Sequence, residues 1–256
     1  MAIKVDFNCD LGEGFGAYRL GSDEDIMPYI SSANIACGFH AGDPVIMRKT
    51  VALAETAGVA IGAHPSFPDL QGFGRREMQL SLEEIRCITT YQIGALTSFT
   101  RNRKLQHVKA HGALYNMAVV NEKIARAFAE GVYQADPEII LVGLAGSVWL
   151  KAGKEAGLKV ASEIFADRAL NADGSLVSRN QPGSVIENED EVVTRALKMV
   201  IECKVTAING NEVAVKGDTI CLHGDTPGAA ALAKRLYDAF KTAGVEITAM
   251  RYFITK

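Results

Sequence analysis

Side chains that can exchange protons or bind a metal ion recur at one position in a repeated pattern. Each stands at the carboxyl end of a short run of small or apolar residues, and helical patterns follow these runs. The six side chains are Asp10, His40, His64, His111, Glu163 and His223. Imidazole titrates near neutral pH, and imidazole with carboxylate is a common ligand set for divalent metal ions. One such histidine is usually structural, but six groups together indicate an acid–base or metal-binding site.

The runs that carry these residues are predicted strands. They cover residues 3–9, 33–38, 59–63, 107–111, 139–143, 158–163 and 218–223, with a weaker eighth at 245–250. Strands that alternate with helices pair in parallel, with the helices outside. Seven or eight such units predict a single domain over residues 1–256, an α/β fold of the distorted TIM-like (β/α) barrel type. An open doubly wound sheet is the alternative. No G-x-G-x-x-G follows the first strand and no G-x-x-x-x-G-K-[ST] occurs, so neither nucleotide loop supports it.

Several local signals mark where helices and turns should lie. The dipeptides Asp43-Pro44 and Thr226-Pro227 each predict a helix start, with proline at the first helical position. Capping-box patterns begin at Ser81 and Asn188, and a long helix is predicted over residues 82–101. One unit departs from the alternation, because residues 204–216 predict an inserted β-hairpin around Asn209-Gly210.

Strand parity predicts which side chains face the barrel interior. Alternate residues of a strand face opposite sides, and the first strand is apolar at positions 5, 7 and 9 but polar at 6, 8 and 10. The same rule places Lys109 and His111 on one face and puts only small residues beside His64 and Glu163. Barrel interiors are normally filled by branched apolar side chains, and barrel enzymes keep their sites at the carboxyl ends of the strands. The predicted site therefore lies at that end.

Two interior residues need separate interpretation. His107 begins its strand, so it is predicted to lie at the opposite end of the barrel and to be structural. Lys109 is expected either to form a buried ion pair with Asp6 or to act on the substrate as a binding group or base.

The loops that follow the strands supply further candidates for substrate binding. Glu13 lies among glycines, which allow the backbone to approach a ligand closely. Arg75 suits a carboxylate or phosphate. Tyr115 and Asn116 follow His111, and Arg168 lies in the turn-rich segment 165–183, which is either a lid or a solvent loop.

Composition narrows the class of protein. The formal net charge of −3 argues against nucleic-acid and anionic-membrane partners, which need a basic surface. The five cysteines are widely spaced and include no C-x-x-C pair, so we expect reduced thiols. Asp6 and Asp10 interrupt the apolar core that a signal peptide needs, and we expect a cytoplasmic protein.

Six blocks of sequence together resemble the LamB/YcsF family from about residue 3 to residue 250. They are NCDLGEGFG, SANIACGFHAGDP, GAHPSFPDLQGFGRR, KAHGALYN, FADRALNADGSLVSR and CLHGDTPGA. The resemblance implies a barrel similar to the glycoside hydrolase/deacetylase superfamily. It also implies the A subunit of an ATP-dependent 5-oxoprolinase, which opens 5-oxoproline (pyroglutamate) to L-glutamate together with two other subunits. Because the chain has no recognisable nucleotide loop, ATP is expected to be bound with or by those partners.

Two other functions stay open. The chain is a stand-alone metal-dependent deacetylase or amidohydrolase if Asp10, His64 and His111 bind a divalent cation. Alternatively it is a non-catalytic substrate-binding subunit. For lactam opening, Asp10 is the expected general base or holder of a metal-bound water, and His64 and His111 are expected to stabilise the oxyanion or deliver a proton. Lys109 is the preferred partner of the substrate carboxylate, because parity aims it inward.

Overall fold

The alternation of strands and helices closes into a parallel barrel. A computed structural model describes residues 2–224 and 228–255. The strands of the ring are β1 (Lys4–Leu11), β2 (Ser32–Ala36), β3 (Ala60–His64), β4 (His107–Val108), β5 (Ile140–Leu144), β6 (Lys159–Phe165) and β9 (Thr219–Leu222). They pair in this order, and β9 also pairs with β1, so seven strands complete the ring. The predicted TIM-like barrel is therefore confirmed.

The weaker eighth strand lies beside the ring. It is β10 (Glu246–Ile247), and it pairs only with Lys4 and Val5 at the start of β1. Residues 6–9 of β1 pair with β9 on the same side. The eight-residue length of β1 thus allows β10 and β9 to share one edge. The predicted hairpin is also present, as β7 (Lys204–Thr206) paired antiparallel with β8 (Glu212–Ala214).

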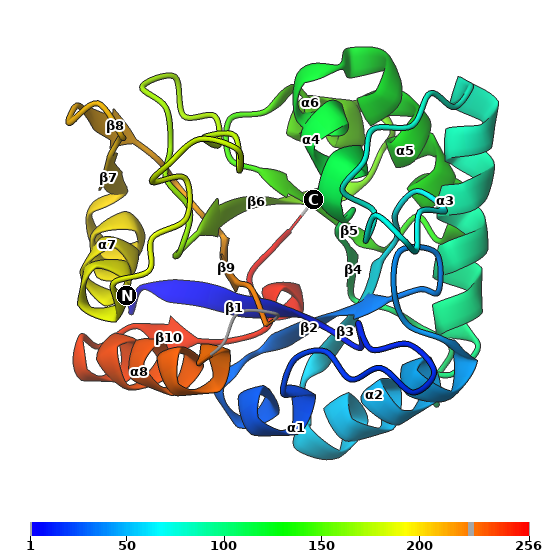
Figure 1. The fold of residues 1–256 in the computed structure, drawn as a ribbon, viewed down its shortest axis with the longest axis horizontal. Helices are drawn as coiled ribbons and strands as arrows, with labels where there is room; N and C mark the ends of the chain where they lie inside the picture. Colours follow the sequence, from blue (N-terminus) through cyan, green and yellow to red (C-terminus); the bar gives the residue numbers. More distant parts are fainter. Residues whose placement is uncertain (1, 225–227, 256) are drawn as a thin grey trace.

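Helices surround the ring, as Figure 1 shows. They are α1 (Asp23–Ile26), α2 (Pro44–Ala57), α3 (Leu82–Thr97), α4 (Gly112–Val120), α5 (Glu122–Ala135), α6 (Val148–Glu155), α7 (Glu189–Glu202) and α8 (Ala229–Thr242), with 3-10 turns η1 (Met27–Tyr29) and η2 (Met250–Tyr252). Within the described residues, no helix combines the length and apolar character needed to cross a membrane.

The predicted helix starts are largely confirmed. The Asp43 carboxylate accepts hydrogen bonds from the first turn of α2, with Pro44 at the first position. Ser81 and Glu84 form the complete capping box of α3, and Asn188 caps α7 through its side chain. The prediction at Thr226-Pro227 includes residues outside the described part of the chain. The helix predicted over 82–101 was too long, because α3 ends at Thr97 and turns follow.

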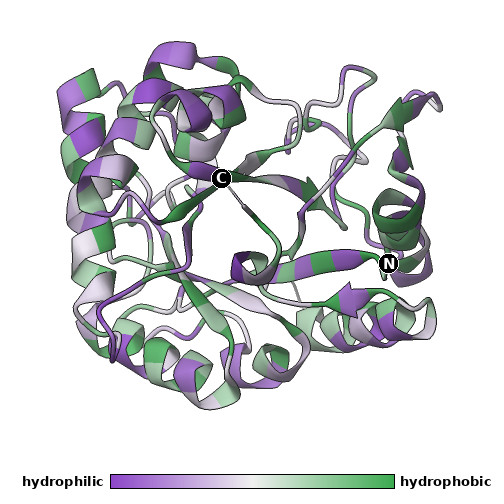
Figure 2. Cartoon of the chain, turned by 180° about the vertical axis from the view of Figure 1, so that it is seen from behind, coloured by the Kyte–Doolittle hydropathy of each residue, from purple (hydrophilic) through white to green (hydrophobic). Residues whose placement is uncertain are grey.

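The two faces of the strands differ as parity predicts. Figure 2 shows β1 banded in alternating hydrophobic and hydrophilic colours. Val5, Phe7 and Cys9 belong to the hydrophobic core, whereas Asp6 and Asn8 are equally buried but bond to polar groups of other strands.

His107 is structural, and a glycine makes room for it. Its Nε2 donates to Asn34 Oδ1 at 2.7 Å, and its Nδ1 accepts from the Gln106 amide at 3.2 Å. Burial lowers the pKa of His107 to about 3, so this side chain is neutral. A Cβ atom at Gly62 on β3 would overlap the imidazole of His107. The interior is therefore as closely packed as an apolar core, with polar groups in place of aliphatic ones.

We predict that Gly62→Ala destabilises the fold by about 1–3 kcal/mol, because the added methyl group must displace a buried ring. Gly94→Ala is the matched control, since a Cβ there meets no atom within 4 Å and lies in helix α3. It should be neutral or stabilising by up to ~1 kcal/mol. Denaturant unfolding measures both. In the His107→Ala protein, adding Gly62→Ala should lower the free energy of unfolding much less than it does in the wild type. Equal losses of free energy in the two proteins would disprove the overlap.

Candidate active site

A cavity of about 570 Å³ opens at the carboxyl ends of the strands. Most of the predicted site residues line it. The predicted residues in its lining are Asp10, His64, Arg75, Lys109, His111, Tyr115, Asn116, Arg168 and His223. The structure thus brings these residues together as expected. Three other candidates, Glu13, His40 and Glu163, lie behind this lining and are buried.

Lys109 occupies the centre of the barrel beneath the cavity. Its Nζ lies 2.9 Å from Asp10 Oδ1, 3.0 Å from Glu163 Oε1 and 3.0 Å from Cys221 Sγ. These acceptors come from β1, β6 and β9. Burial alone would lower the pKa of Lys109, but the negative groups around it hold that pKa well above its usual range. The ammonium is therefore a fixed positive charge.

The alternative that paired Lys109 with Asp6 was wrong. Asp6 lies deeper in the barrel, where its carboxylate accepts hydrogen bonds from Ser31, Ser32 and Thr219. Burial raises the pKa of Asp6 to about 6, against the opposing effect of these hydroxyl groups. The physical reason is register, because Lys109 extends toward the carboxyl ends of the strands and meets Asp10, which lies further along the same face of β1.

Asp10 is held in place from three sides. Asn34 donates to its Oδ1 at 2.8 Å, Lys109 contacts the same oxygen, and His64 Nε2 lies 3.3 Å from its Oδ2. Burial opposes ionisation, but the charges of His64 and Lys109 hold the pKa of Asp10 well below its usual range. Asp10 is therefore an ionised carboxylate with a fixed orientation. Asn34 was not among the predicted site residues, although it has the inward parity of β2.

His64 and His111 face each other through one ring nitrogen each. His64 Nδ1 lies 2.8 Å from the carbonyl oxygen of Lys109, and His111 Nε2 lies 2.8 Å from that of Phe73. A carbonyl only accepts, so each of these nitrogens carries the hydrogen. The remaining nitrogens, His64 Nε2 and His111 Nδ1, are 3.0 Å apart. Two lone pairs at this distance repel each other unless a proton or a cation lies between them.

His40 completes this group from an unexpected place. It was predicted at a strand end, but β2 stops at Ala36 and His40 lies in the loop that follows, after Gly38 with a φ of 89°. Its ring stacks on His111 with centroids 3.9 Å apart, and its Nδ1 is buried without a hydrogen-bond partner. Burial lowers the pKa values of His40 and His111 well below the usual value, so both rings are neutral and able to act as ligands.

The donor set at this point fits a divalent cation. Ligand atoms of Glu13, His40, His64 and His111 all lie within 4.8 Å of one another. Glu13 Oε1 is 3.4 Å from both His40 Nε2 and His111 Nδ1. Neutral imidazoles with one carboxylate are ligands that zinc and similar ions accept. The donor set predicted from the sequence was Asp10, His64 and His111. The geometry keeps the two histidines and brings in Glu13 and His40.

His223 lies in a separate polar chain that also lines the cavity. Its Nδ1 donates to Asp167 Oδ2 at 2.9 Å, and its Nε2 accepts from Arg179 at 3.1 Å. Asp167 and Arg179 were not selected from the sequence as site residues. Their position in the FADRALNADGSLVSR block beside Arg168 was the signal available.

The segment over residues 166–188 is ordered against the barrel by Arg168. The Arg168 guanidinium donates to the carbonyl oxygens of Ser184 and Val177 at 3.1 and 2.6 Å. Short antiparallel bridges, Arg168 with Val185 and Leu170 with Leu176, hold the two sides of the segment together. It forms one wall of the cavity.

Three arginines make the loop side of the cavity cationic. Arg75 comes from the loop after β3, and Arg168 and Arg179 come from the segment after β6. The Arg75 guanidinium lies over the ring of Phe73 at 4.9 Å. Desolvation, with repulsion from Arg179 and Arg75, lowers the pKa of Arg168 to about 10. A small anion in the cavity therefore meets positive charge on this side.

Tyr115 and Glu163 lie beside each other in the interior, and each has a polar atom that makes no hydrogen bond of ordinary geometry. The atoms are Tyr115 Oη and Glu163 Oε2, and both are fully buried. Burial, together with the charge of Glu163 nearby, raises the pKa of Tyr115 well above its usual value. The phenol is therefore protonated across the working pH range. Tyr115 also packs edge-on against Trp149, with ring centroids 5.1 Å apart.

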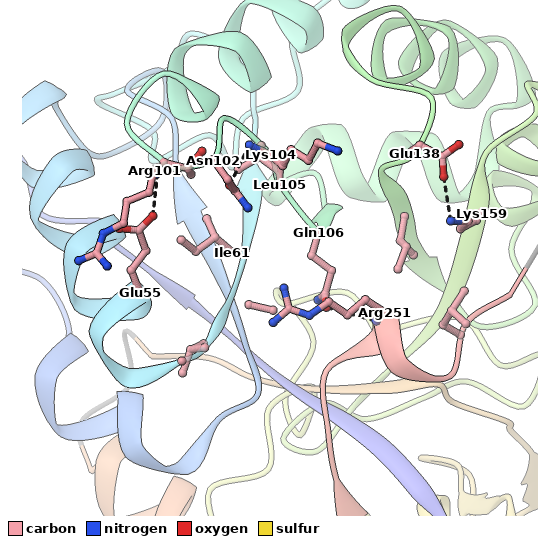
Figure 3. A pocket seen from close by; sticks show the side chains of 16 residues that line it. Glu55, Ile61, Arg101, Asn102, Lys104, Leu105, Gln106, Glu138, Lys159 and Arg251 are labelled. Atoms are coloured by element: carbon pink, nitrogen blue, oxygen red, sulfur yellow. Dashed lines mark hydrogen bonds and ion pairs between the residues drawn. The ribbon is translucent and has the colours of Figure 1, made fainter.

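A second cavity, of about 510 Å³, lies at the opposite end of the barrel (Figure 3). It is formed at the starts of β3 to β6. Its charged side chains are largely paired, Arg101 with Glu55 and Lys159 with Glu138, each at 3.0 Å. Among the described residues that line it, none belongs to the acid–base group at the mouth. Chemistry is therefore expected at the mouth.

Comparison with known proteins agrees with this class of barrel. The profile of the LamB/YcsF family matches residues 5–255, and the chain belongs to this family. It is 53% identical over 250 residues to the A subunit of the 5-oxoprolinase of Bacillus subtilis, covering 97% of each chain. It superposes on the lactam utilization protein of Thermus thermophilus with a TM-score of 0.91 and 49% identity, covering 96% and 99% of the two chains.

A more distant similarity concerns the fold alone. The peptidoglycan deacetylase PdaC of Bacillus subtilis matches with a TM-score of 0.50 and 10% identity over 96% of this chain and 87% of that one. This supports the predicted likeness to deacetylase barrels.

We predict that Lys109→Met destabilises the protein by about 3–5 kcal/mol, because two buried carboxylates lose their shared cation. Lys104→Met is the control, since Lys104 is exposed at the far end of the barrel. Chemical denaturation of both variants measures the effect. A Lys109→Met protein as stable as the control would mean that the ammonium serves only the substrate.

Proposed function

We propose that this chain is the A subunit of an ATP-dependent 5-oxoprolinase and that its mouth cavity opens the lactam of 5-oxoproline to L-glutamate. The observation that carries the proposal is the fixed Asp10 carboxylate facing the His64–His111 pair at the base of a cavity. Relatives that bear this name match over nearly the whole of both chains, which supports the same activity here.

Lactam opening needs three things from the site. Water must be activated for attack on the ring carbonyl, the oxygen must be stabilised as charge develops on it, and the departing nitrogen must receive a proton. Asp10 takes the proton from the attacking water, since it is ionised and oriented by Asn34 and Lys109. The His64–His111 pair supplies charge stabilisation at the oxyanion through a proton held between its facing nitrogens.

The substrate carboxylate is assigned to the loop side of the cavity. Lys109 was the preferred partner from parity, but its ammonium already contacts two carboxylates and a thiol. Arg75, Arg168 and Arg179 line the same cavity, and a guanidinium binds a carboxylate through paired hydrogen bonds. The lactam is thereby held with its ring toward the acid–base group.

Glu13, His40, His64 and His111 would hold a divalent cation if one is bound. When bound, such an ion supplies Lewis-acid polarisation of the carbonyl and a more acidic water. Asp10, whose Oδ2 lies 3.3 Å from His64 Nε2, would remain the group that accepts the proton from water.

The energy source is assigned to partner subunits. Opening of a five-membered lactam to glutamate is uphill near neutral pH, so the reaction has to be coupled to ATP. No glycine-rich nucleotide loop occurs in the chain. We therefore propose that ATP is bound with or by the other subunits of the complex, and that this chain handles the lactam.

We expect Asp10→Asn to lower the maximal rate of glutamate formation by about a hundredfold or more in the complex reconstituted with its partner subunits, as loss of a general base does. The fold should survive, because the amide oxygen of the new side chain still accepts from Asn34 and Lys109. Glutamate release is measured with and without the partners. Robust ATP-dependent glutamate release by the chain alone, or an Asp10→Asn variant with full activity, would refute the assignment.

Metal content can be tested without an activity assay. After dialysis against zinc or manganese and removal of free ions, we expect about one ion per wild-type chain and a clear loss in His111→Gln. Glu55→Gln is the control, since Glu55 pairs with Arg101 in the cavity at the opposite end of the barrel. Elemental analysis gives the readout. If wild type and His111→Gln both lack the ion, a proton rather than a cation joins His64 and His111.

A further inference from the structure

The opening of the lactam ring needs an acid for the departing nitrogen, and the histidines of the mouth are not placed to be that acid. The hydrogens of His64 Nδ1 and His111 Nε2 are donated to backbone carbonyl oxygens. Their other nitrogens face each other at 3.0 Å. His223 donates its hydrogen to Asp167 and accepts from Arg179. The three imidazoles that line the cavity thus have both nitrogens engaged with the protein, and His40, with an unpartnered Nδ1, is buried outside that lining.

The cations of the cavity are equally unsuited to proton transfer. Lys109 shares its hydrogens with Asp10, Glu163 and Cys221, so its ammonium is already engaged with the protein. Guanidinium groups keep their protons at any working pH, so the arginines bind anions without donating a proton. The acid has to be another side chain of the lining.

Tyr115 has the properties that these groups lack. It lines the cavity, and its buried hydroxyl makes no hydrogen bond of ordinary geometry, with the Glu163 carboxylate as its polar neighbour. A buried hydroxyl without a partner carries a free-energy cost, which a bound ligand can remove by accepting its hydrogen.

The surroundings of Tyr115 hold its hydroxyl in one place. The residue lies in the first turn of α4, shortly after Lys109 and His111, which follow β4. Its ring packs edge-on against Trp149 and Phe165, with centroids 5.1 and 5.9 Å away. Contacts with two aromatic rings leave the ring of Tyr115 little freedom for rotation, so packing fixes the direction of the hydroxyl.

The hydroxyl lies beside the other carboxylate that contacts Lys109. The Lys109 ammonium contacts Asp10 from β1 and Glu163 from β6, and Tyr115 lies beside Glu163. The base is therefore one of the two carboxylates that contact Lys109, and the acid lies beside the other. A tetrahedral adduct bound between them presents the attacked face to one and the departing nitrogen to the other, as an acid–base pair requires.

We propose that Tyr115 is a catalytic residue and gives its hydroxyl proton to the ring nitrogen as the lactam opens. This inference rests on the proposed function and adds the acid that the reaction needs. Tyr115 was expected from the sequence to bind substrate, and the proposal gives it a chemical role as well.

Every proton in this step has a source and a destination. An oxygen–carbon bond forms when water attacks the ring carbon, and the proton of the water passes to Asp10. The carbon–nitrogen bond then breaks, its electron pair stays on nitrogen, and the nitrogen takes the proton of Tyr115. The phenolate regains a proton from Asp10 through water in the cavity, and the product is glutamate. Water is the only co-reactant of the step, while ATP consumed with the partner subunits drives the overall reaction.

The negative charge of Glu163 destabilises the phenolate form of Tyr115. A phenolate beside a carboxylate is repelled by it, so the proton leaves Tyr115 only as the nitrogen takes it and returns quickly. The same repulsion keeps the phenol protonated before each turnover. Glu163 is therefore a positioning residue that keeps the acid in its working form.

The test compares Tyr115→Phe with wild type in the complex reconstituted with its partner subunits. The variant removes one oxygen and keeps the ring that packs on Trp149 and Phe165, so thermal unfolding should show an intact fold. Tyr133→Phe is the matched control, because it removes the same hydroxyl from a half-exposed tyrosine of α5. Glutamate formation is measured in water enriched in oxygen-18, with recovered 5-oxoproline analysed for the label by mass spectrometry.

We expect Tyr115→Phe to lower kcat about a hundredfold while the Michaelis constant changes less than about threefold, because the hydroxyl acts in the transition state. Water still attacks, but the adduct reverts to lactam when the nitrogen receives no proton. Reversion leaves oxygen-18 in the recovered 5-oxoproline. The ratio of oxygen-18 incorporated into 5-oxoproline to glutamate formed should therefore rise about tenfold or more in Tyr115→Phe. Wild type and Tyr133→Phe should share one low ratio.

The comparison with Asp10→Asn separates the acid from the base. Without the base, water does not attack, so exchange and glutamate formation should fall together. If Tyr115→Phe shows this joint fall, or keeps full activity, or raises only the Michaelis constant, the role as acid is overturned. If the wild-type complex forms no glutamate from 5-oxoproline, the proposed function itself fails. An active wild-type complex with an unchanged ratio in Tyr115→Phe refutes only the role of Tyr115.

Discussion

The Lys109 ammonium, enclosed by Asp10, Glu163 and Cys221, is the interaction on which the rest of the site depends. A buried cation is costly unless acceptors surround it, and here they come from three strands besides its own segment. The charge therefore ties β1, β6 and β9 to the chain after β4 where the barrel opens. It also keeps Asp10 ionised, while the second oxygen of Asp10 lies toward His64. The residue that stabilises the barrel mouth thus sets the protonation state of the proposed base.

This polar centre constrains the strands around it. Asn8 donates to Glu163 and Thr219, and Asn34 donates to Asn8 and Asp10, so amide groups join the carboxylates directly. Room for these groups comes from small neighbours such as Gly62, while apolar side chains on the outer faces of the strands pack against the helices. The barrel is stable because one face of each strand builds the core and the other builds the site.

The strands, the hairpin and most of the cavity lining could be predicted from the sequence. Alternation with a period of two indicates where a strand lies and also which of its side chains face the barrel interior. Prediction was poorer where the chain leaves the strands. His40 was placed by extending the parity of β2, but the chain turns at Gly38 and brings the imidazole over His111 by a loop path that no periodicity encodes. Parity also placed Lys109 and Asp6 on inward faces, but it does not give the position of each side chain along the barrel axis. The stagger between strands makes Asp10 the ion-pair partner of Lys109. Asp167 and Arg179 lie in a long segment with no regular pattern, so their meeting at His223 follows only from tertiary contacts.

One side of the cavity is formed by the strands around Lys109, and the other by loops that carry arginines. The thermodynamics of lactam opening accounts for both sides. A site made only of acids and bases lowers a barrier but leaves an uphill reaction uphill, since a catalyst changes rates and not equilibria. The energy has to arrive through the partner subunits, so the mouth has to serve as an entrance as well as a place for chemistry. The strand side, built around Lys109, is buried and fixed by many hydrogen bonds, as proton transfer requires. The arginine side is carried by loops at the rim, where it meets an anion that enters. A barrel can combine the two because its strands fix one set of groups, while its loops present the other from the same end.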